Sequence, residues 1–551
     1  MENLKMLFNF LGGVGMFLYG LHIMAEGLQK TAGSRMKKLM GYLTNNRLLA
    51  VLVGTAITAV MQSSSATTVM VVGFVNAEIL SLTQAVGVIM GANIGTTVTA
   101  WIVSMNELGS LFKPEFFAPL VVGIAAFLIL FTKSDRKKTY GELFIGFGLL
   151  FIGLSFMSSS IAPYKNAPIF STVFETLGKN PILGILAGTA VTALIQSSSA
   201  SVGILQTLAM NGVLAWNSVV YITLGQNIGT CITALISSAG AKRNAKRAAV
   251  IHLLFNVIGA VIAGIIMYIL FYFNTEWANS RITSVQISIF HTFFNVINTI
   301  ILFPFAGKLV KMSEFIVRDK AEKNTEEDTE NELLPHLDDR IMENPSFAVE
   351  QVEAEIVRMG NLATDQLRLS MDALLTISGK KAKKVLIIEE TMDKTAHILT
   401  NYLVKVSGLS LTEKENQIVS NLFYAVNDIE RIGDHCDNIA GMVLRMKDDD
   451  LEFSEKAIKE LNQIYTKTID AVIQANVARE FKDLKAVEIT MQNEEVVDEL
   501  EEMMRKGHIK RLSKHQCNAQ SGIIFLAVIT SLERIADHAV NLAGYVKEEI
   551  S

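Results

Sequence analysis

Two runs of uncharged polar residues interrupt apolar segments of this 551-residue chain. The first run is Gln62, Ser63, Ser64 and Ser65, and the second is Gln196, Ser197, Ser198 and Ser199. A helix broken at such a run exposes backbone N–H groups at one end and C=O groups at the other. The N–H groups, together with serine hydroxyls, can hold an anion, whereas carbonyl, amide and hydroxyl oxygens can hold Na⁺.

Charged residues are almost absent around both runs. Glu78 is the only charged residue between Ala50 and Met105, and residues 181–240 contain none. An anion bound without Lys or Arg would be costly in a medium of low dielectric constant, and cations bound beside it would offset that cost. The absence of a titratable side chain also disfavours a proton relay. The pattern therefore favours binding that is coupled to other ions.

Each run belongs to a longer segment that occurs twice, 134 residues apart. Residues 54–66 recur as 188–200, and the run Gly-x-Asn-Ile-Gly-Thr at 91–96 recurs at 225–230. This pattern indicates an internal duplication. We expect the polar residues of the second motif to line the same site, namely Asn93, Thr96, Asn227 and Thr230; the alternative, that this motif is only a close contact between helices, is disfavoured by its paired occurrence. The alternative is that the serines only bond to the preceding turn or pack helices together, but three consecutive serines point in different directions on a helix.

The distribution of charge divides the chain into two parts. Residues 1–304 contain 18 Lys and Arg against 9 Asp and Glu, whereas residues 305–551 contain 31 against 45. A sparsely charged half joined to a highly charged half excludes a single soluble domain and predicts a membrane domain followed by a water-soluble one. The acidic character of the second half argues against nucleic acid as a partner.

The membrane domain is predicted over residues 1–306, as an all-α, polytopic fold with inverted repeats and two re-entrant hairpins. Repeat one covers about 7–131 and repeat two about 142–273, and the last span is 283–304. The four stretches beside the polar runs are shorter than the ~20 apolar residues that a spanning helix needs, so we expect them to form hairpins. Basic loops place the C-terminal half in the cytoplasm. Seven crossings are predicted, at 7–26, 84–104, 117–131, 142–158, 218–239, 248–273 and 283–304.

The soluble half is predicted to be an acidic linker, 307–344, and a helical bundle, 345–551. A Glu-Arg-Ile-x-Asp-His-x-x-Asn pattern occurs in it twice, 103 residues apart. Its carboxylates, Glu430 with Asp434 and Glu533 with Asp537, stand four residues apart on one helix face, where like charges repel. A bound cation would relieve that repulsion, and two such faces could share a cluster. The alternative is a salt-bridged helix in which Arg431 or Arg534 neutralises its neighbours.

The duplicated Gln-Ser-Ser-Ser motif resembles that of the type II sodium/phosphate cotransporter family over about residues 5–304. The resemblance implies that both hairpins, through residues 62–65 and 196–199, form the inorganic phosphate site and the Na⁺ sites. The bundle motif resembles the PhoU family of two repeated three-helix bundles. That resemblance implies a role in phosphate regulation and metal binding by such acidic residues, for which we expect a divalent or iron-type metal.

These observations predict a multi-pass cell (inner) membrane protein, with the lipid bilayer as its surroundings, that couples inorganic phosphate transport to Na⁺. The sequence allows a cytoplasmic regulatory protein as a further binding partner, and it does not determine the oligomeric state. The alternative function is a membrane-anchored phosphate sensor that binds but does not transport. No catalytic constellation is visible in the sequence, so we do not expect an enzyme.

Overall fold

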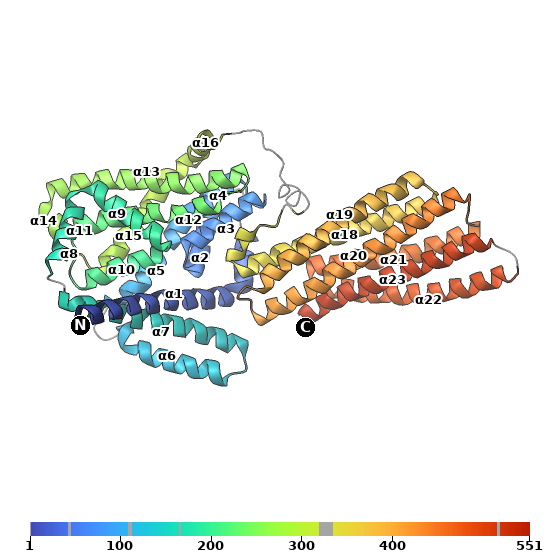
Figure 1. Cartoon of the computed structure of the whole chain (residues 1–551), viewed down its shortest axis with the longest axis horizontal. Coiled ribbons are helices and arrows are strands. Elements are labelled where there is room, and N and C mark those ends of the chain that lie inside the picture. Colours follow the sequence, from blue (N-terminus) through green and yellow to red (C-terminus); the bar gives the residue numbers. More distant parts are fainter. Residues whose placement is uncertain are drawn as a thin grey trace. The chain divides into compact units, whose positions relative to one another are not determined.

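A computed structural model of the protein describes residues 2–41, 46–107, 113–164, 167–318, 334, 336–514 and 518–550. Regular structure among them is helical, apart from one isolated β-bridge between Ala215 and Arg281 (Figure 1). The chain forms two compact units, Met1–Lys323 with Asp338–Ser346 and Asn324–Leu337 with Phe347–Ser551. Part of the proposed linker is thus helical, in α16 (Ala306–Ile316) and the 3-10 helix η4 (Asp339–Glu343).

The first unit confirms the seven predicted spans. Seven helices, or helices continued across a short break, are long and apolar enough to cross a membrane in the described part of the chain. Two of them are broken near their middle. The spans are α1 (Glu2–Gly41), α4 with α5 (Leu82–Gly95, Thr97–Ser104), α6 (Pro114–Phe131), α7 (Asp135–Ile161), α11 with α12 (Trp216–Gly229, Cys231–Ser237), α13 (Arg243–Phe273) and α15 (Ser284–Leu302) followed by α16.

The segments around the polar runs are pairs of short helices. The first pair is α2 (Arg47–Met61) with α3 (Ser64–Asn76), and the second is α9 (Pro181–Ile195) with α10 (Ser198–Met210). The cap residues Asn46 and Asn180 accept hydrogen bonds from backbone N–H groups of the first turns of α2 and α9. An additional helix, α8 (Pro168–Lys179), precedes α9 at a bend of 117°.

Glycines let the first helix of each hairpin cross a neighbouring span at backbone contact. A Cβ on Gly91 of α4 would collide with the Val51 carbonyl of α2, and one on Gly225 of α11 would collide with the Ile185 carbonyl of α9. The Thr55 hydroxyl donates to the Gly91 carbonyl at 3.2 Å, and Thr189 does the same to Gly225 at 3.1 Å. The two repeats thus use the same contact at equivalent positions.

The helices that begin the two repeats pack against each other. A Cβ on Gly13 of α1 would lie 2.9 Å from the Gly153 carbonyl of α7, and one on Gly20 would lie 2.7 Å from the Gly146 carbonyl. Gly13 and Gly20 stand 133 residues before Gly146 and Gly153, at corresponding positions of the two repeats, so each glycine meets the counterpart of the other. Such reciprocal contacts are those of a two-fold axis between the repeats.

The two hairpins enter from opposite ends of α13, which is about 46 Å long at 1.5 Å per residue. At the start of α13, the Lys242 N–H donates to Asn76, the last residue of α3, at 2.7 Å. Beyond its other end, the Ser280 carbonyl accepts from the Trp216 N–H at 3.2 Å, in the segment that follows α10. This arrangement confirms the prediction of inverted repeats with re-entrant hairpins.

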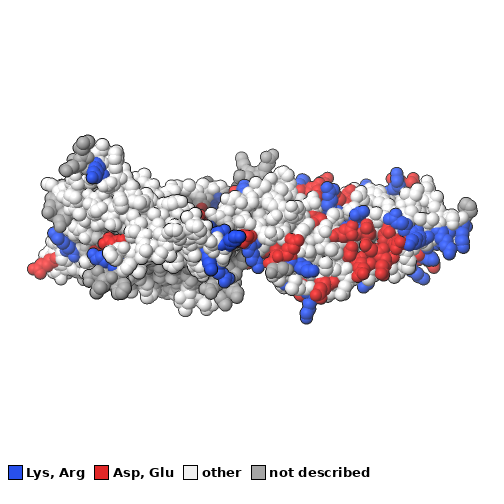
Figure 2. Space-filling view, turned by 90° about the horizontal axis from the view of Figure 1, so that it is seen from below, with Lys and Arg blue, Asp and Glu red and all other residues white. Residues whose placement is uncertain are grey.

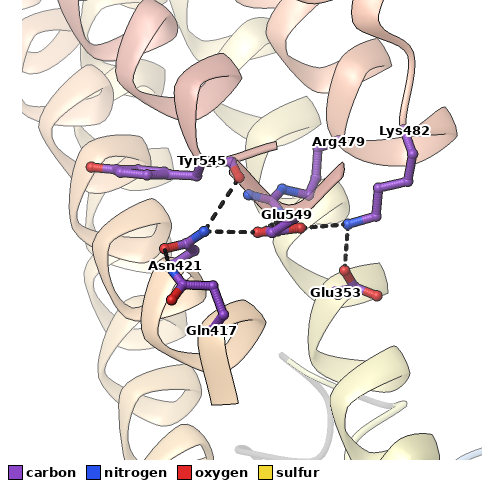
Figure 3. Close-up of polar contacts among 7 residues, drawn as sticks. All are labelled: Glu353, Gln417, Asn421, Arg479, Lys482, Tyr545 and Glu549. Atoms are coloured by element: carbon purple, nitrogen blue, oxygen red, sulfur yellow. Dashed lines mark hydrogen bonds and ion pairs between the residues drawn. The ribbon is translucent and has the colours of Figure 1, made fainter. Parts of the chain in front are cut away.

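The second unit is a bundle of long helices, as predicted. Its helices are α18 (Pro345–Leu375), α19 (Gly379–Ser407), α20 (Glu413–Asp448), α21 (Glu455–Phe481), α22 (Leu484–Leu512) and α23 (Ala519–Ile550). A buried ion cluster joins several of them at one place (Figure 3). Glu549 accepts from Arg479 at 2.7 Å and from Lys482 at 2.8 Å, and Lys482 also pairs with Glu353. The side chains of Arg479 and Glu549 are only 5% and 2% exposed, so this charge is buried as a balanced set.

Candidate functional site

Each Gln-Ser-Ser-Ser run is the break between the two helices of a hairpin. Gln62 ends α2 in the left-handed region, with φ 53° and ψ 19°, and Gln196 ends α9 with φ 56° and ψ 22°. Ser63 and Ser197 then cap α3 and α10, each accepting a hydrogen bond from the backbone N–H three residues later, at 3.1 and 3.2 Å. The glutamine reverses the chain and the first serine starts the next helix.

The second and third serines of each run form the first turn of the new helix. The backbone N–H groups of such a turn have no partner within the helix, and the helix dipole makes this end favourable for an anion. The four serines concerned are buried, with exposed fractions between 3% and 8%: Ser64, Ser65, Ser198 and Ser199. These four serines are therefore shielded from lipid, as a shared polar site requires.

The two hairpins touch at these residues. The Ser199 hydroxyl lies 3.4 Å from the Gln62 carbonyl oxygen and 3.4 Å from Oγ1 of Thr99. Thr99 in turn donates to Oε1 of Gln62 at 2.9 Å. Residues 137 positions apart in the sequence thus meet at one buried point, which lies between the repeats.

Thr99 was missing from the predicted site, although the sequence contains a signal for it. The second motif is longer than assumed, because Thr99 and Thr233 also stand 134 residues apart and follow Thr96 and Thr230 at the same spacing. The Thr99 side chain is buried against hairpin one, whereas the Thr233 hydroxyl is buried without a hydrogen-bond partner. A search that continued the repeat alignment by three residues would have found both.

The predicted residues of the second motif lie at the breaks of the two broken spans. Thr96 separates α4 from α5, and Thr230 separates α11 from α12. The Oγ1 of Thr96 and the Nδ2 of Asn227 are buried without a hydrogen-bond partner, while Oδ1 of Asn227 lies 3.3 Å from Nε2 of His291. Asn93 is buried and bonds to the carbonyl of its own preceding turn at 2.9 Å. Thr96 and Asn227 thus retain polar atoms that are free to meet a ligand.

The two copies of the site are not in the same state. Gln62 is 4% exposed and held by Thr99, whereas Gln196 is exposed. Ser199 contacts hairpin one, but no equivalent bond joins Ser65 to Gln196 or Thr233 in the described residues. The Gln62 break is therefore buried by contacts within the protein, whereas the side chain at the equivalent break of hairpin two is exposed.

In the bundle, the predicted carboxylate pairs lie in two separate acidic clusters rather than in one shared cluster. Glu430 and Asp434 of α20 face Asp393 of α19, and Glu533 and Asp537 of α23 face Asp498 of α22. The facing helices carry the same Glu-x-x-x-Asp spacing, as Glu389 with Asp393 and Glu494 with Asp498. These two pairs lack the flanking Arg and His of the longer motif, so the repeated pattern does not include them.

Both clusters hold like charges together. Oxygen atoms of Glu494, Asp498 and Asp537 all lie within 4.8 Å of one another, a spacing that suits a metal ion. Partial burial and the nearby carboxylates Asp393, Asp437 and Asp434 raise the pKa of Glu389 from 4.5 to about 7. Figure 2 shows acidic side chains gathered on the bundle surface, whereas the first unit shows few charges. The ion pairs expected of a salt-bridged helix, the alternative to a metal site, are also present. Arg431 lies 3.1 Å from Asp434, and Arg534 lies 3.2 Å from Asp537.

The histidine and asparagine of the second bundle motif have a structural partner that the sequence did not indicate. His538 and Asn541 of α23 bond to the buried carboxylate of Asp428 on α20, at 2.7 and 3.3 Å. The Tyr545 hydroxyl donates to the same carboxylate at 2.7 Å. This network joins α20 to α23, and so the two halves of the bundle.

Inverted repeats whose broken helices meet at a charge-free polar site define the architecture of secondary transporters. The chain matches the Na⁺/Pi-cotransporter family over residues 16–159 and 166–299, and it belongs to that family. The PhoU domain matches twice in the second unit, over 356–443 and 458–546. The protein is thus a multi-pass membrane protein of a phosphate transporter family with a fused PhoU domain.

Relatives of known name cover the whole chain or one of its units. Over 98% of both chains, it is 24% identical to the "Putative inorganic phosphate export protein YjbB" of Escherichia coli (strain K12). It is 25% identical to the phosphate-specific transport system accessory protein PhoU homolog 1 of Thermotoga maritima, over 35% of this chain and 84% of that one. It is 33% identical to the human sodium-dependent phosphate transport protein 2B, over 19% of this chain and 15% of that one.

Proposed function

We propose that this protein is a sodium-coupled transporter of inorganic phosphate, with the PhoU-type bundle as its cytoplasmic regulatory domain. The observation that supports this most directly is that the buried first turn of α10, through Ser199, contacts Gln62 at the break of hairpin one, which precedes the buried first turn of α3, at a point between inverted repeats. Two such termini offer several N–H and O–H donors to one tetrahedral oxyanion. The family and the names of the relatives support phosphate as that oxyanion.

Sodium coupling rests on the lack of fixed charge. A phosphate in this site meets donors but no Lys or Arg, because the chain has none between residues 181 and 240 and only Glu78 between Ala50 and Met105. Sodium ions held by backbone carbonyls and by oxygens of Gln62, Thr96, Gln196 and Thr230 would neutralise it. Each ion then stabilises the other in the low dielectric, so that neither binds well alone.

Phosphate flux into proteoliposomes tests the proposal. We expect uptake of labelled phosphate to require a Na⁺ gradient, and reversing the gradient should reverse the net flux; equal flux with K⁺ would refute the coupling. Ser64→Ala and Ser198→Ala each remove a donor to a charged ligand, which is worth about 1.5–3 kcal/mol and weakens apparent affinity about 10- to 100-fold. The matched control is Ser159→Ala, at an exposed serine of α7. Phosphate binding without flux would instead favour a sensor.

The bundle is proposed to hold metal in its two acidic clusters and to lie on the cytoplasmic side. The basic residues near the start of α13, such as Arg243 and Lys246, lie on the side at which hairpin one enters. By the positive-inside rule this is the cytoplasmic side. A divalent or iron-type metal would relieve the repulsion within each Glu-x-x-x-Asp pair.

A further inference from the structure

The segment just before the bundle, residues 338–343, is part of the first unit and packs against its helices. Asp338 accepts from Nδ2 of Asn76, the last residue of α3, at 2.6 Å. Its neighbour Arg340 donates to the carbonyl of Ser237, the last residue of α12, at 2.6 Å, and to the carbonyl of Ala239 at 3.3 Å. Arg340 also pairs with Asp338 at 2.8 Å. We call residues 338–343 the strap.

The surface that receives the strap is shaped for it. A Cβ on Gly73 of α3 would lie 2.8 Å from Cβ of Arg340 and 3.3 Å from the side chain of Ile341, so only glycine leaves room for the strap at this position. Ile341 is fully buried and Asp338 is 7% exposed. A buried carboxylate with a guanidinium partner and an amide donor is a specific contact, in contrast to the loose packing expected of a linker.

The strap joins two elements that belong to different repeats. Helix α3 is the second half of hairpin one, and α12 is the second half of the broken span of repeat two. The Arg340 cation satisfies carbonyls at the C-terminal end of α12, where a positive charge is favourable. In the inverted-repeat architecture, access alternates when the repeats move relative to each other. A contact that holds α3 to α12 opposes such a movement.

The strap leads directly into the bundle, since α18 begins at Pro345, two residues after η4 ends. We propose that the strap is an autoinhibitory latch: seated, it holds hairpin one and α12 together and slows transport, and a change in the bundle releases it. The inference rests on the proposed transport function. It gives the fused bundle a physical route to the hairpins through the polypeptide itself.

Reconstituted full-length protein tests the latch with two independent variants. Arg340→Ala removes the bonds to α12, and Gly73→Ala blocks the seat from the side of α3. Each should raise the initial rate of phosphate flux about fivefold, near the lower end of typical coupling between sites. The controls are Lys311→Ala, which removes an exposed charge on α16, and Gly123→Ala, where a Cβ meets no atom within 4 Å. Rates that stay at or fall below the wild-type rate in both test variants would overturn the proposal.

A reversible cross-link supplies the opposite test. Asn76→Cys with Asp338→Cys, in a Cys517→Ser background, should react with a short bifunctional thiol reagent because the two side chains are in contact; Cys231 and Cys436 are buried. Linked protein should lose flux and regain it on reduction, and undiminished flux in the linked protein would refute the latch. Labelling of Ser64→Cys by a membrane-impermeant thiol reagent needs no transport, and Gly73→Ala should accelerate it. A wild-type protein without flux would refute the proposed function alone, whereas unchanged labelling would refute the latch.

Discussion

The hairpin site and the acidic clusters of the bundle are both suited to ions, but they are built with opposite electrostatics. The hairpin site contains hydroxyls, amides and backbone ends, and the two Gln-Ser-Ser-Ser runs carry no charged side chain. The bundle concentrates carboxylates from facing helices, such as Glu389 of α19 with Asp434 of α20 and Glu494 of α22 with Asp537 of α23. Each solution fits its surroundings, because an unpaired charge is far more costly in a membrane interior than at a water-exposed helix face.

The difference teaches where each region obtains its selectivity. Under the proposed function, no fixed charge in the hairpin site compensates either ion, so an anion and cations would have to bind together. In the bundle, charge is already present and repulsive, so a cation alone is enough to stabilise it. The ion cluster at Glu549 differs from both regions, because its buried carboxylate is balanced by Arg479 and Lys482.

The largest expected effect comes from placing a charge in the neutral site. Ser199→Asp puts a carboxylate where the Gln62 carbonyl and the Thr99 hydroxyl meet Ser199. Burial and repulsion of phosphate should cost several kcal/mol, and about 3 kcal/mol already lowers flux more than 100-fold. Ser159→Asp, at an exposed position, should leave flux near that of the wild type. If Ser199→Asp transports normally, the charge-free character of the site has no functional meaning.

A smaller effect is expected from unbalancing the buried ion cluster. Glu549→Gln leaves Arg479 buried without its carboxylate and should lower the free energy of unfolding of the bundle by about 3 kcal/mol. Hydrogen exchange of α21 and α23 in the full-length protein measures this. The neighbouring Glu548→Gln changes an exposed carboxylate and should have little effect. Replacing both Arg479 and Glu549 by Leu should recover most of the stability, and a result in which Glu548→Gln is equally destabilising would contradict the assignment.

The smallest effect concerns the pH dependence of the acidic cluster. Glu389 has a pKa raised from 4.5 to about 7, so the folded state holds its proton more tightly than the unfolded state does. The stability that this proton confers is complete below about 4.5 and is lost as the pH rises through about 7. In the presence of a chelator, and after correction for the intrinsic exchange rate at each pH, the free energy of opening of α19 and α20 measured by hydrogen exchange should therefore be higher at pH 5.5 than at pH 7.5, by less than about 1 kcal/mol because solvent screens the repulsion.

Two comparisons sharpen this measurement. Glu389→Gln should flatten the pH dependence, whereas Glu390→Gln, which is exposed on the same helix, should keep it. Adding a divalent cation at pH 7.5 should restore the protection that is lost with rising pH. A pH dependence that is identical in the presence and absence of Glu389 would show that repulsion in this cluster is negligible.

The sequence predicted the membrane architecture because its signals are local or periodic. Apolar length identified the spans, the 134-residue repeat paired the hairpins, and consecutive polar residues located the helix breaks at Gln62 and Gln196. These features depend on the conformational and hydrophobic preferences of short segments. The folded structure retains those preferences.

The features that escaped prediction depend on which surfaces meet. The contact of Ser199 with Thr99 joins two repeats, and the partner of Glu430 is chosen by the packing of α19 on α20. The strap escaped because its bonded residues, Asp338 and Arg340, have the polar composition of a linker. Polarity alone does not distinguish a solvated segment from one whose charges are all bound.

The glycine crossings within each repeat have a mechanical consequence. Where α2 lies on α4 and α9 lies on α11, main chains touch with no side chain between them, so neither pair can slide without steric collision. Each hairpin's first helix is thereby fixed to its broken span as one stiff pair, and the two pairs approach each other at the seam where Ser199 contacts Gln62, while α1 and α7 hold the repeats together elsewhere. Cargo lodged in that seam would act as a wedge, and its arrival or departure would set how far the two stiff pairs can tilt.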